Sequence, residues 1–524
     1  MIEHKPWIAA YPKGASAELV ALAHRHVPAM LREAARTYAE QTAFTVCLPN
    51  GTAASLSFAE ADRLSDAFAA FLRLDLGLRT GDRVGVQMPN GFGYVVAAFG
   101  ILKAGCVLVN VNPLYKPDET RHQLADAEAR ALVVIDMFAD RLDAETLAGL
   151  DHVVLASVVD FFPALKRHLV ALTLRYVKRQ VPPPRFHHVT MTDAVAAGRR
   201  RLSAQPDAVA VFADSLQPES TAALQYTGGT TGVAKGAMLS HRNLIANVVQ
   251  GYEMVDELVD AGRECCLTAL PLYHIFAFTS SLLGMYRAGA HNILIPSPRP
   301  VANLRPAFQK YPVTWTSGVN TLFNALNNEP WFADSPPQHL KASIAGGVKL
   351  HEDVADRWEA LTGSPIVEGY GLTEASPTLT LTPFSAPQRR NTIGVPVPGT
   401  DVRLVDDDGT PVGRGTPGEL QARGPQVMQG YWKRPEETAA TLQDGWLATG
   451  DIAVMGDDGF FRIVDRKKDI IIVSGFNVYP NEVEECIAAM EGVEEAAVVG
   501  IHDDATGEAV KAFVAASGGV VSED

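Results

Sequence analysis

Apolar and polar positions recur with two different periods along the first third of the chain. Residues 58–72 carry apolar side chains at intervals of three and four, which predicts an amphipathic helix, and Ser57 and Glu60 have capping-box spacing at its start. Three short apolar runs separated by helical patterns are predicted to be strands: 83–88, 107–111 and 131–135. This alternation is typical of a parallel sheet covered by helices. We therefore expect an α/β fold, with a large N-terminal domain of parallel or mixed sheets flanked by helices.

Length and composition narrow the class of protein. A chain of 524 residues is too long for one compact core, so we expect at least two domains. The apolar fraction of 47% and the charged fraction of 20% are ordinary for a globular protein. A net charge of −15 argues against nucleic acid as a partner. The five cysteines have no metal-binding spacing, which indicates a reduced, cytoplasmic setting.

One stretch departs from the acidic character of the chain. Phe161–Pro184 contains basic residues and no acid, and the basic positions are Lys166, Arg167, Arg175, Lys178 and Arg179. Its main apolar stripe at helical spacing is Leu165, Leu169, Leu172 and Tyr176. The stretch fits peripheral contact with an anionic membrane, at the inner face of the cytoplasmic membrane, and it equally fits a solvated helix. The sequence leaves both open.

A second stretch, Cys265–Tyr286, carries no Asp, Glu, Lys or Arg over 22 residues. That length could cross a bilayer by count alone. Pro271 and His274 interrupt the apolar run, so we expect a buried loop and helix here and no membrane span.

The segment Tyr226–Gly236 has the composition of a phosphate-binding loop and reads YTGGTTGVAKG. Glycines let the backbone approach an anion, threonine hydroxyls donate hydrogen bonds, and Lys235 adds a positive charge. A plain glycine-rich turn between two strands is the alternative. The P-loop of kinases and GTPases is excluded, because Lys235 lies between Ala234 and Gly236, without the Gly before it and the Ser or Thr after it.

A second loop, Gly369–Ser376, reads GYGLTEAS. Its glycines would let the Tyr370 ring lie flat on a purine, and Thr373 and Glu374 offer ligands for a phosphate and its metal. Further along, Asp451 in DGWLATGD is predicted to lie at a strand end, where a carboxylate can accept both ribose hydroxyls.

These segments, together with LPLYHIF, TGD and DRKKDIIIVSGFNVYPNE, resemble the signature of the adenylate-forming (AMP-binding) superfamily. Across essentially the whole chain they resemble the bacterial long-chain fatty-acid–CoA ligases. The resemblance implies activation of a long-chain fatty acid by ATP and Mg²⁺ to acyl-AMP, followed by thioesterification with coenzyme A.

The resemblance also implies roles for individual residues. The implied catalytic residues are Thr227, Thr230, Lys235, Thr373 and Glu374, with Glu374 as the Mg²⁺ ligand. The implied nucleotide contacts are Tyr226, Gly228, Gly229, Thr231, Gly232, Gly346, Gly347, Gly369, Tyr370, Gly371, Asp451 and Arg466. The implied substrate pocket consists of His274, Phe276, Val319 and Asn320. Lys468 resembles the hinge between the two domains, and Gly475 the loop that approaches CoA.

The resemblance implies a large AMP-binding domain at 1–464 and the start of a small mobile α+β domain at 465–524. In the family, the small domain carries a lysine near its far end that bridges the substrate carboxylate and the α-phosphate. No segment up to Asp524 matches it, and Lys511 has strand surroundings. We therefore expect an incomplete small domain and slow adenylation, since losing one preorganised charge costs about 10²–10³ in rate.

Two other functions remain open on the sequence alone. A related enzyme could pass the acyl group to a carrier protein or an amine, and a nucleotide- or acyl-binding form could lack catalysis. The apolar runs HIFAFTSSLLGM and VNTLFNAL favour an alkyl chain, and no Asp near them would hold an amino group. Whether the protein forms a homodimer is also left open.

Overall fold

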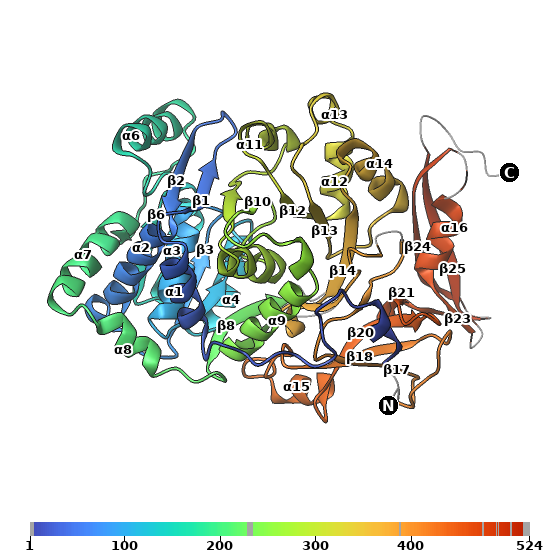
Figure 1. The fold of residues 1–524 in the computed structure, drawn as a ribbon. Helices are drawn as coiled ribbons and strands as arrows, with labels where there is room; N and C mark the ends of the chain where they lie inside the picture. Colours follow the sequence, from blue (N-terminus) through green and yellow to red (C-terminus); the bar gives the residue numbers. More distant parts are fainter. Residues whose placement is uncertain are drawn as a thin grey trace.

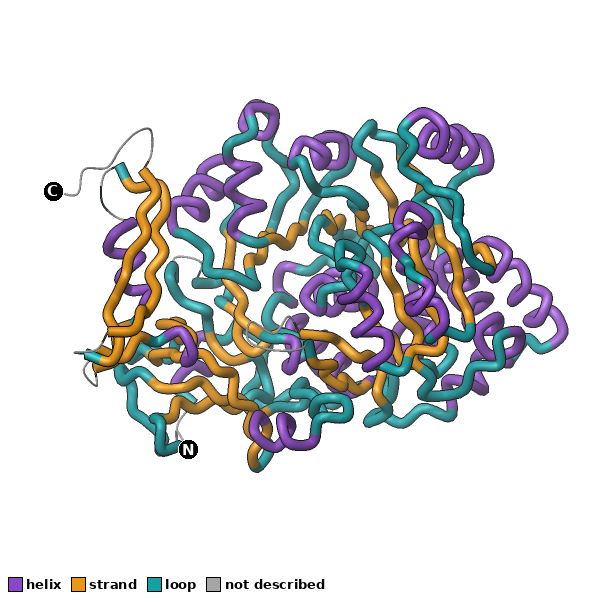
Figure 2. The backbone as a smooth tube through the Cα atoms, turned by 180° about the vertical axis from the view of Figure 1, so that it is seen from behind, coloured by secondary structure: helices purple, strands orange, loops and turns teal. Residues whose placement is uncertain are grey.

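The computed structural model describes residues 5–227, 234–386, 389–473, 476–488, 490, 492–503 and 506–516. A large N-terminal part contains three sheets, and a small unit with a long two-stranded hairpin lies at one end of the molecule (Figures 1 and 2). The predicted α/β class, with a large and a small part, is confirmed.

The first sheet has seven strands in the order β7-β6-β5-β3-β4-β8-β9 and is parallel except for the last pair. Its strands are β3 (Arg83–Gln87), β4 (Val107–Asn110), β5 (Ala129–Ile135), β6 (His152–Ala156), β7 (Val189–Thr190), β8 (Thr221–Thr227) and β9 (Lys235–Ser240). The three predicted apolar runs are therefore neighbouring strands of one sheet. They are buried along most of their length, as expected when helices cover both faces.

Helices α2 (Phe58–Ala70), α3 (Phe92–Lys103) and α7 (Met191–Ala204) pack beside one another near this sheet (Figure 1). The predicted capping box is present, since Ser57 N donates to Glu60 Oε2 at 2.8 Å and Glu60 N donates to Ser57 Oγ at 3.2 Å. The other helical segments of this region are η2 (Phe71–Asp75), α4 (Pro117–Asp126), η3 (Asp136–Arg141), α5 (Ala144–Ala148), α6 (Ala164–Leu172), η4 (Thr173–Val177) and α8 (Ala208–Asp214).

The second sheet has nine strands in the order β16-β15-β14-β13-β12-β10-β11-β1-β2, with a parallel centre and antiparallel ends. Its strands are β1 (Thr42–Cys47), β2 (Ala53–Ser57), β10 (Cys265–Thr268), β11 (His291–Leu294), β12 (Trp315–Gly318), β13 (Ala342–Ala345), β14 (Ile366–Gly371), β15 (Thr378–Leu381) and β16 (Val395–Pro396). The carboxyl ends of β12, β13 and β14 point the same way, which is where parallel sheets place ligands.

Helix α1 (Val27–Thr37) contacts α9 (His241–Glu253), and α9 begins with Ser240 as its N-cap. The other helical segments that precede the third sheet in sequence are η1 (Pro6–Ala10), η5 (Asp256–Leu258), η6 (Ala277–Gly284), α10 (Met285–Arg287), η7 (Val301–Leu304), α11 (Arg305–Lys310), α12 (Asn320–Asn327), α13 (Pro330–Asp334), α14 (Glu352–Thr362) and η8 (Thr373–Ala375).

The uncharged stretch Cys265–Tyr286 is interior structure. It begins as strand β10 and, after a loop, continues as helix η6, with most of its side chains buried. The expected loop and helix are present, and the strand was not expected. Within the described ranges, no helix combines the length and the apolar character needed to cross a bilayer.

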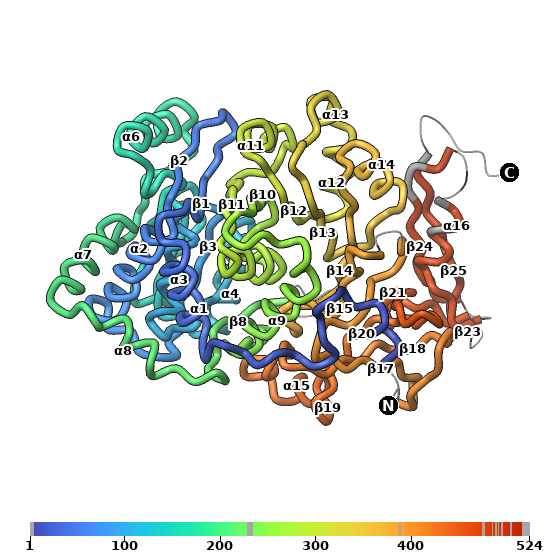
Figure 3. The backbone as a smooth tube through the Cα atoms, in the orientation of Figure 1, coloured from blue at the N-terminus to red at the C-terminus, as the bar shows by residue number. Residues whose placement is uncertain are grey.

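The third sheet is antiparallel and contains β17 (Asp401–Val405), β18 (Gly418–Arg423), β19 (Leu442–Gln443), β20 (Trp446–Met455) and β21 (Phe461–Arg466), with α15 (Pro435–Thr441) before β19. The N-terminal segment crosses the molecule to reach it (Figure 3). Lys5 forms an ion pair of 2.7 Å with Asp401, and the Tyr11 hydroxyl donates to Pro396 O at 2.6 Å.

The small unit is an antiparallel sheet in the order β23-β22-β25-β24, with one helix. It consists of β22 (Ile471–Val473), β23 (Phe476–Val478), α16 (Pro480–Ala488), β24 (Val493–Asp503) and β25 (Gly507–Ala516), and it follows η9 (Lys467–Asp469). β21 still belongs to the third sheet and ends at Arg466. The predicted domain boundary at 464/465 falls just before that strand's end and stays a prediction.

Candidate active site

One cavity of about 1290 Å³ gathers most of the residues that the sequence singled out. Its walls come from the ends of β8 and β9, helices α9 and η6, the loops after β13 and β14, and strands β20 and β21. The predicted residues that line it are Thr227, Lys235, His274, Phe276, Gly346, Gly347, Gly369, Tyr370, Gly371, Thr373, Glu374, Asp451, Arg466 and Lys468. Segments nearly 250 residues apart in sequence therefore face one space.

The glycine- and threonine-rich loop joins two adjacent antiparallel strands. Thr227 pairs with Lys235, so both residues stand where β8 and β9 meet the cavity. The predicted residues between them, Gly228, Gly229, Thr230, Thr231 and Gly232, lie outside the described residues.

Tyr226 is not among the residues that line the cavity, so its predicted nucleotide contact has no support from this geometry and stays a prediction. Successive side chains of a strand point to opposite faces, so Tyr226 points away from the side on which Thr227 lies. Its hydroxyl donates to Asp126 Oδ2 at 2.7 Å, and burial raises its pKa above the ordinary value. The residue anchors the end of β8.

The loop after β14 depends on its glycines. The pairing of β14 with β15 shifts register between Tyr370 and Gly371. A Cβ atom on Gly371 would lie 2.0 Å from Pro377 O, so only glycine allows this close approach. The Tyr370 hydroxyl donates to Asp451 Oδ2 at 2.5 Å, which joins the second sheet to the third.

Asp451 lies inside strand β20 and not at a strand end, which corrects the sequence prediction. It pairs with Arg466 on β21, and Arg466 Nε lies 3.6 Å from Asp451 Oδ1. Burial raises the pKa of Asp451, while Tyr370 and Arg466 oppose that rise. The carboxylate is therefore held between a hydroxyl and a guanidinium at the cavity wall.

Glu374 lies in η8 and is held from a distant part of the chain. The Tyr431 hydroxyl donates to Glu374 Oε1 at 2.6 Å, and Lys235 Nζ lies 5.2 Å from the centroid of the Tyr431 ring. Sequence reasoning missed Tyr431. It lies 57 positions from Glu374 in a stretch without a recognised motif, and no local pattern signals such a contact.

The cavity wall at Glu374 suits a magnesium ion that is bound by the protein together with substrate, and it does not suit one that is bound by the protein alone. No group of three or more His, Cys, Asp or Glu side chains suited to a metal exists among the described residues. Glu374 supplies a carboxylate at the cavity wall, where Mg²⁺ is usually bound by one or two carboxylates together with substrate phosphates and water.

Two of the four residues predicted for the acyl pocket lie at the cavity wall, and their role there stays a prediction. His274 and Phe276 line the cavity, and burial lowers the pKa of His274, which favours the neutral ring. Val319 and Asn320 do not line it. Asn320 Oδ1 accepts a hydrogen bond from His351 N at 3.0 Å, and Val319 precedes α12 and packs beside Gly347. Both are used in packing the start of α12.

The sequence missed a further apolar wall of the cavity. It comes from one face of α9, the segment after it, and the helical turn η6–α10. The residues are Val248, Gly251, Tyr252, Val255, Val259, Met285 and Ala288. These residues give the cavity an apolar part, which we call the apolar branch. Part of the signal was available, since Val248, Gly251 and Tyr252 are spaced by three and four positions on the helix that follows the glycine-rich loop.

The connection to the small unit also reaches the cavity. Lys467 and Lys468 lie in η9 and line it, and Lys467 forms an ion pair of 3.0 Å with Glu419. Gly475, the predicted CoA-loop residue, lies outside the described residues.

Comparison with known proteins agrees with this geometry. The model of the AMP-binding enzyme family matches residues 31–432, and that of the AMP-binding enzyme C-terminal domain matches residues 482–524. The chain therefore belongs to the AMP-binding enzyme family, and the resemblance inferred from its motifs is confirmed.

Within that family, the chain is 46% identical over 512 residues to the long-chain-fatty-acid–CoA ligase of Yersinia pestis, covering 97% of this chain and 89% of that protein. It is 36% identical over 520 residues to the ligase of the same name from Bacillus subtilis, covering 98% and 89%. Among solved structures, ATP-bound MatB from Rhodopseudomonas palustris has a TM-score of 0.79 and 27% identity, covering 95% of this chain and 90% of that chain.

Proposed function

We propose that this protein is a long-chain fatty-acid–CoA ligase that consumes ATP and releases AMP and pyrophosphate. The observation that carries the proposal is that one cavity is lined by Thr227, Lys235, Thr373 and Glu374, by Tyr370, Asp451 and Arg466, and by the apolar branch. We call the first four residues the phosphate corner, for the role proposed here. The identity to curated long-chain-fatty-acid–CoA ligases over nearly the whole chain supports the same activity. Enzymes of this family use ATP, Mg²⁺ and CoA.

In the first half-reaction, a carboxylate oxygen of the fatty acid attacks the α-phosphorus of ATP. A new O–P bond forms, the bond to the leaving pyrophosphate breaks, and acyl-AMP results. Such a transfer is accelerated mainly by positioning and charge neutralisation. Thr227, Lys235 and Thr373 would bind the phosphates, together with the loop residues Thr230 and Thr231. Glu374 would hold Mg²⁺, which when bound offsets negative charge on the phosphates.

In the second half-reaction, the CoA thiolate attacks the acyl carbonyl carbon, and AMP leaves with the electrons of the broken C–O bond. The adenosine stays in place through Tyr370 against the base and through Asp451 and Arg466 at the ribose. We propose that residues 465–524 rotate about Lys468 between the two half-reactions, and that the loop of Gly475 then approaches CoA.

The apolar branch would hold the alkyl chain. Gly251 and Tyr252 on α9 and Met285 on α10 form its walls, and His274 and Phe276 border its junction with the nucleotide site. A neutral His274 leaves the substrate carboxylate as the charged group at this junction, where the phosphate-binding residues can orient it.

The test is AMP formation from ATP, Mg²⁺ and palmitate with three acceptors: CoA, an acyl carrier protein, or none. We expect steady AMP formation only with CoA, together with palmitoyl-CoA. Turnover with carrier protein in place of CoA would favour transfer to a protein. ATP binding without AMP formation under any condition would favour the non-catalytic alternative.

We also propose that the protein works in the cytoplasm at the inner face of the cytoplasmic membrane, through the segment Phe161–Pro184. The support is the arrangement of α6 and η4. Val170 and Ala171 are half-buried against the body, whereas the apolar stripe Leu165, Leu169, Leu172 and Tyr176 is exposed. The exposed fractions in that stripe are 74% for Leu165, 58% for Leu169, 54% for Leu172 and 68% for Tyr176.

Apolar side chains exposed in a row on a basic helix suit an anionic lipid surface. The rest of the chain is acidic, so a negatively charged membrane would be attracted to this segment and repelled elsewhere. Lys166 makes a contact within the protein, because its ammonium donates to Ala53 O at 2.8 Å. Arg175, Lys178 and Arg179 are exposed beside the stripe.

Flotation with vesicles containing phosphatidylglycerol tests this contact. The double substitution Leu165→Ser and Leu169→Ser should abolish most binding, because the lost apolar insertion is worth several kcal/mol at about 25 cal/mol per Å². Val211→Ser is the matched control, since Val211 is 63% exposed on α8, outside the segment. Vesicle binding that survives the double substitution would refute the proposal. Dimers that dissociate on the same substitution would assign the stripe to a homodimer interface.

A further inference from the structure

A short segment remote in sequence braces the phosphate corner. We call residues 428–434 the bracing segment. It runs beside β9, where Met238 N donates to Gly430 O at 2.9 Å and Trp432 N donates to Gly236 O at 2.8 Å. The strand that carries Lys235 is thereby paired on its outer edge, which fixes the direction of its first residues.

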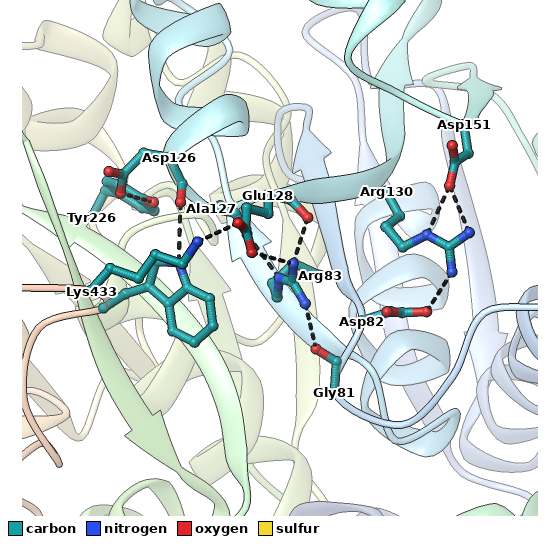
Figure 4. Close-up of polar contacts among 11 residues, drawn as sticks. Gly81, Asp82, Arg83, Asp126, Ala127, Glu128, Arg130, Asp151, Tyr226 and Lys433 are labelled. Carbon is teal, nitrogen blue, oxygen red and sulfur yellow. Dashed lines mark hydrogen bonds and ion pairs between the residues drawn. The ribbon is translucent and has the colours of Figure 1, made fainter.

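The far end of the bracing segment is anchored at the connection between α4 and β5. The Asp126 carboxylate accepts from the Tyr226 hydroxyl at 2.7 Å and from Arg434 at 2.5 Å, and its backbone oxygen accepts from Trp432 Nε1 at 3.1 Å. Figure 4 shows Tyr226 meeting Asp126 while Lys433 reaches Glu128 beside them. Tyr226 near the end of β8 and the bracing segment thus share one half-buried carboxylate.

Tyr431, in the middle of the bracing segment, touches both charged groups of the phosphate corner. Its hydroxyl binds Glu374 Oε1 at 2.6 Å, and its ring faces the Lys235 ammonium. The backbone of Glu374 is held by the same segment, because Met428 N donates to Glu374 O at 2.7 Å. The side chain of Tyr431 is only 8% exposed, so little freedom remains for either contact.

We propose that Tyr431 is a positioning residue for the metal–phosphate site: its hydroxyl fixes the Glu374 carboxylate for Mg²⁺, and its ring limits where the Lys235 ammonium can lie. The inference rests on the function proposed above. Partners that orient a metal-binding carboxylate contribute about 10–100-fold to metal affinity.

Tyr431→Phe tests the role of the hydroxyl and retains the ring beside Lys235. The Mg²⁺ concentration for half-maximal pyrophosphate release should rise about 10–100-fold, and saturating Mg²⁺ should restore the rate. KM for the fatty acid should not change. A second readout needs no turnover. Electron paramagnetic resonance measures the binding of Mn²⁺ in the presence of a non-hydrolysable ATP analogue, and this binding should weaken by a similar factor.

Two control variants separate positioning from folding. Tyr11→Phe removes a hydroxyl that donates to Pro396 O outside the cavity, and it should leave metal dependence unchanged. Trp432→Phe removes a hydrogen bond of the same bracing segment without touching Glu374. An equal shift in metal dependence for Trp432→Phe and Tyr431→Phe would assign the effect to the segment and overturn the role of Tyr431.

The outcome for the wild-type protein distinguishes the two proposals. If it neither releases pyrophosphate nor binds Mn²⁺ with the ATP analogue, the proposed function fails. If it does both and Tyr431→Phe keeps the wild-type metal dependence, only the role of Tyr431 is wrong. An unchanged metal dependence excludes that role even if the melting temperature of the variant falls.

Discussion

At the scale of single residues, the charged groups of the site are held by the protein itself. Asp451 contacts Tyr370 and Arg466, and Glu374 contacts Tyr431. A carboxylate fixed in this way loses little conformational freedom when a nucleotide arrives, so more of the interaction energy is available for binding.

Replacing Asp451 by Asn should weaken ATP binding markedly. Hydrogen bonds to a charged group are worth about 1.5–3 kcal/mol, which corresponds to roughly a 10- to 150-fold rise in Kd. Titration calorimetry measures the effect, with Asp457→Asn as a control in the exposed turn between β20 and β21. Wild-type affinity in the Asp451→Asn protein would show that the carboxylate does not contact the ribose.

At the scale of elements, the sequence predicted the strands and helix starts that depend on contacts within a few residues. The strands at 83–88, 107–111 and 131–135 and the Ser57 capping box are present, because burial period and capping act within a few residues. The prediction that Asp451 lies at a strand end was wrong, since Gly450, with φ of 72°, resembles the start of a turn although β20 continues to Met455.

The rest of the site could not be read from the sequence because it depends on partners distant along the chain. Tyr226 was expected at the nucleotide, yet its partner Asp126 lies 100 positions away. Asn320 was expected in the acyl pocket, but it bonds the backbone of His351, 31 positions away. The spacing of apolar residues gives no information about such distant contacts. The predicted residues that do line the cavity were found from short motifs, because their glycines and hydroxyls by themselves indicate phosphate binding.

The loop after β14 yields a test at the element scale. Gly371→Ala would place a methyl group 2.0 Å from Pro377 O, so the segment holding Thr373 and Glu374 must shift. We expect a loss of about 1–3 kcal/mol in unfolding free energy and weaker ATP binding. Gly91→Ala is the matched control, because a Cβ atom there meets no atom within 4 Å. Denaturant melts and calorimetry on both variants would reveal a loop that tolerates the methyl group.

At the scale of the whole molecule, buried histidines join α1 to α9. His241 Nδ1 accepts from Val27 N at 3.3 Å, and His26 caps α1 beside it. Burial lowers the pKa of His241 to about 3 and also lowers that of His26. The unfolded chain takes up a proton near pH 6.5, whereas the folded protein resists it. Stability is therefore complete above about pH 6.5 and falls as pH drops toward 3.

His241→Asn should flatten this acid loss. Between pH 6.5 and 5, His241 alone should cost the wild-type protein about 2 kcal/mol of unfolding free energy, a cost that the variant does not carry. Urea unfolding at the two pH values, monitored by tryptophan fluorescence, measures the difference in midpoint. The exposed His187→Asn serves as the control. Parallel pH profiles for wild type and His241→Asn would contradict the assignment.

The pairing of β9 with residues 428–432 also orders events during synthesis on the ribosome. β9 ends at Ser240, but the strand-like stretch that covers its outer edge is translated 192 residues later, at Trp432. At about 5–20 residues per second, that rim stays bare for about 10–40 s. A nascent chain of this protein therefore passes through an interval in which a second strand could add to the open rim, and chaperone occupancy should peak there.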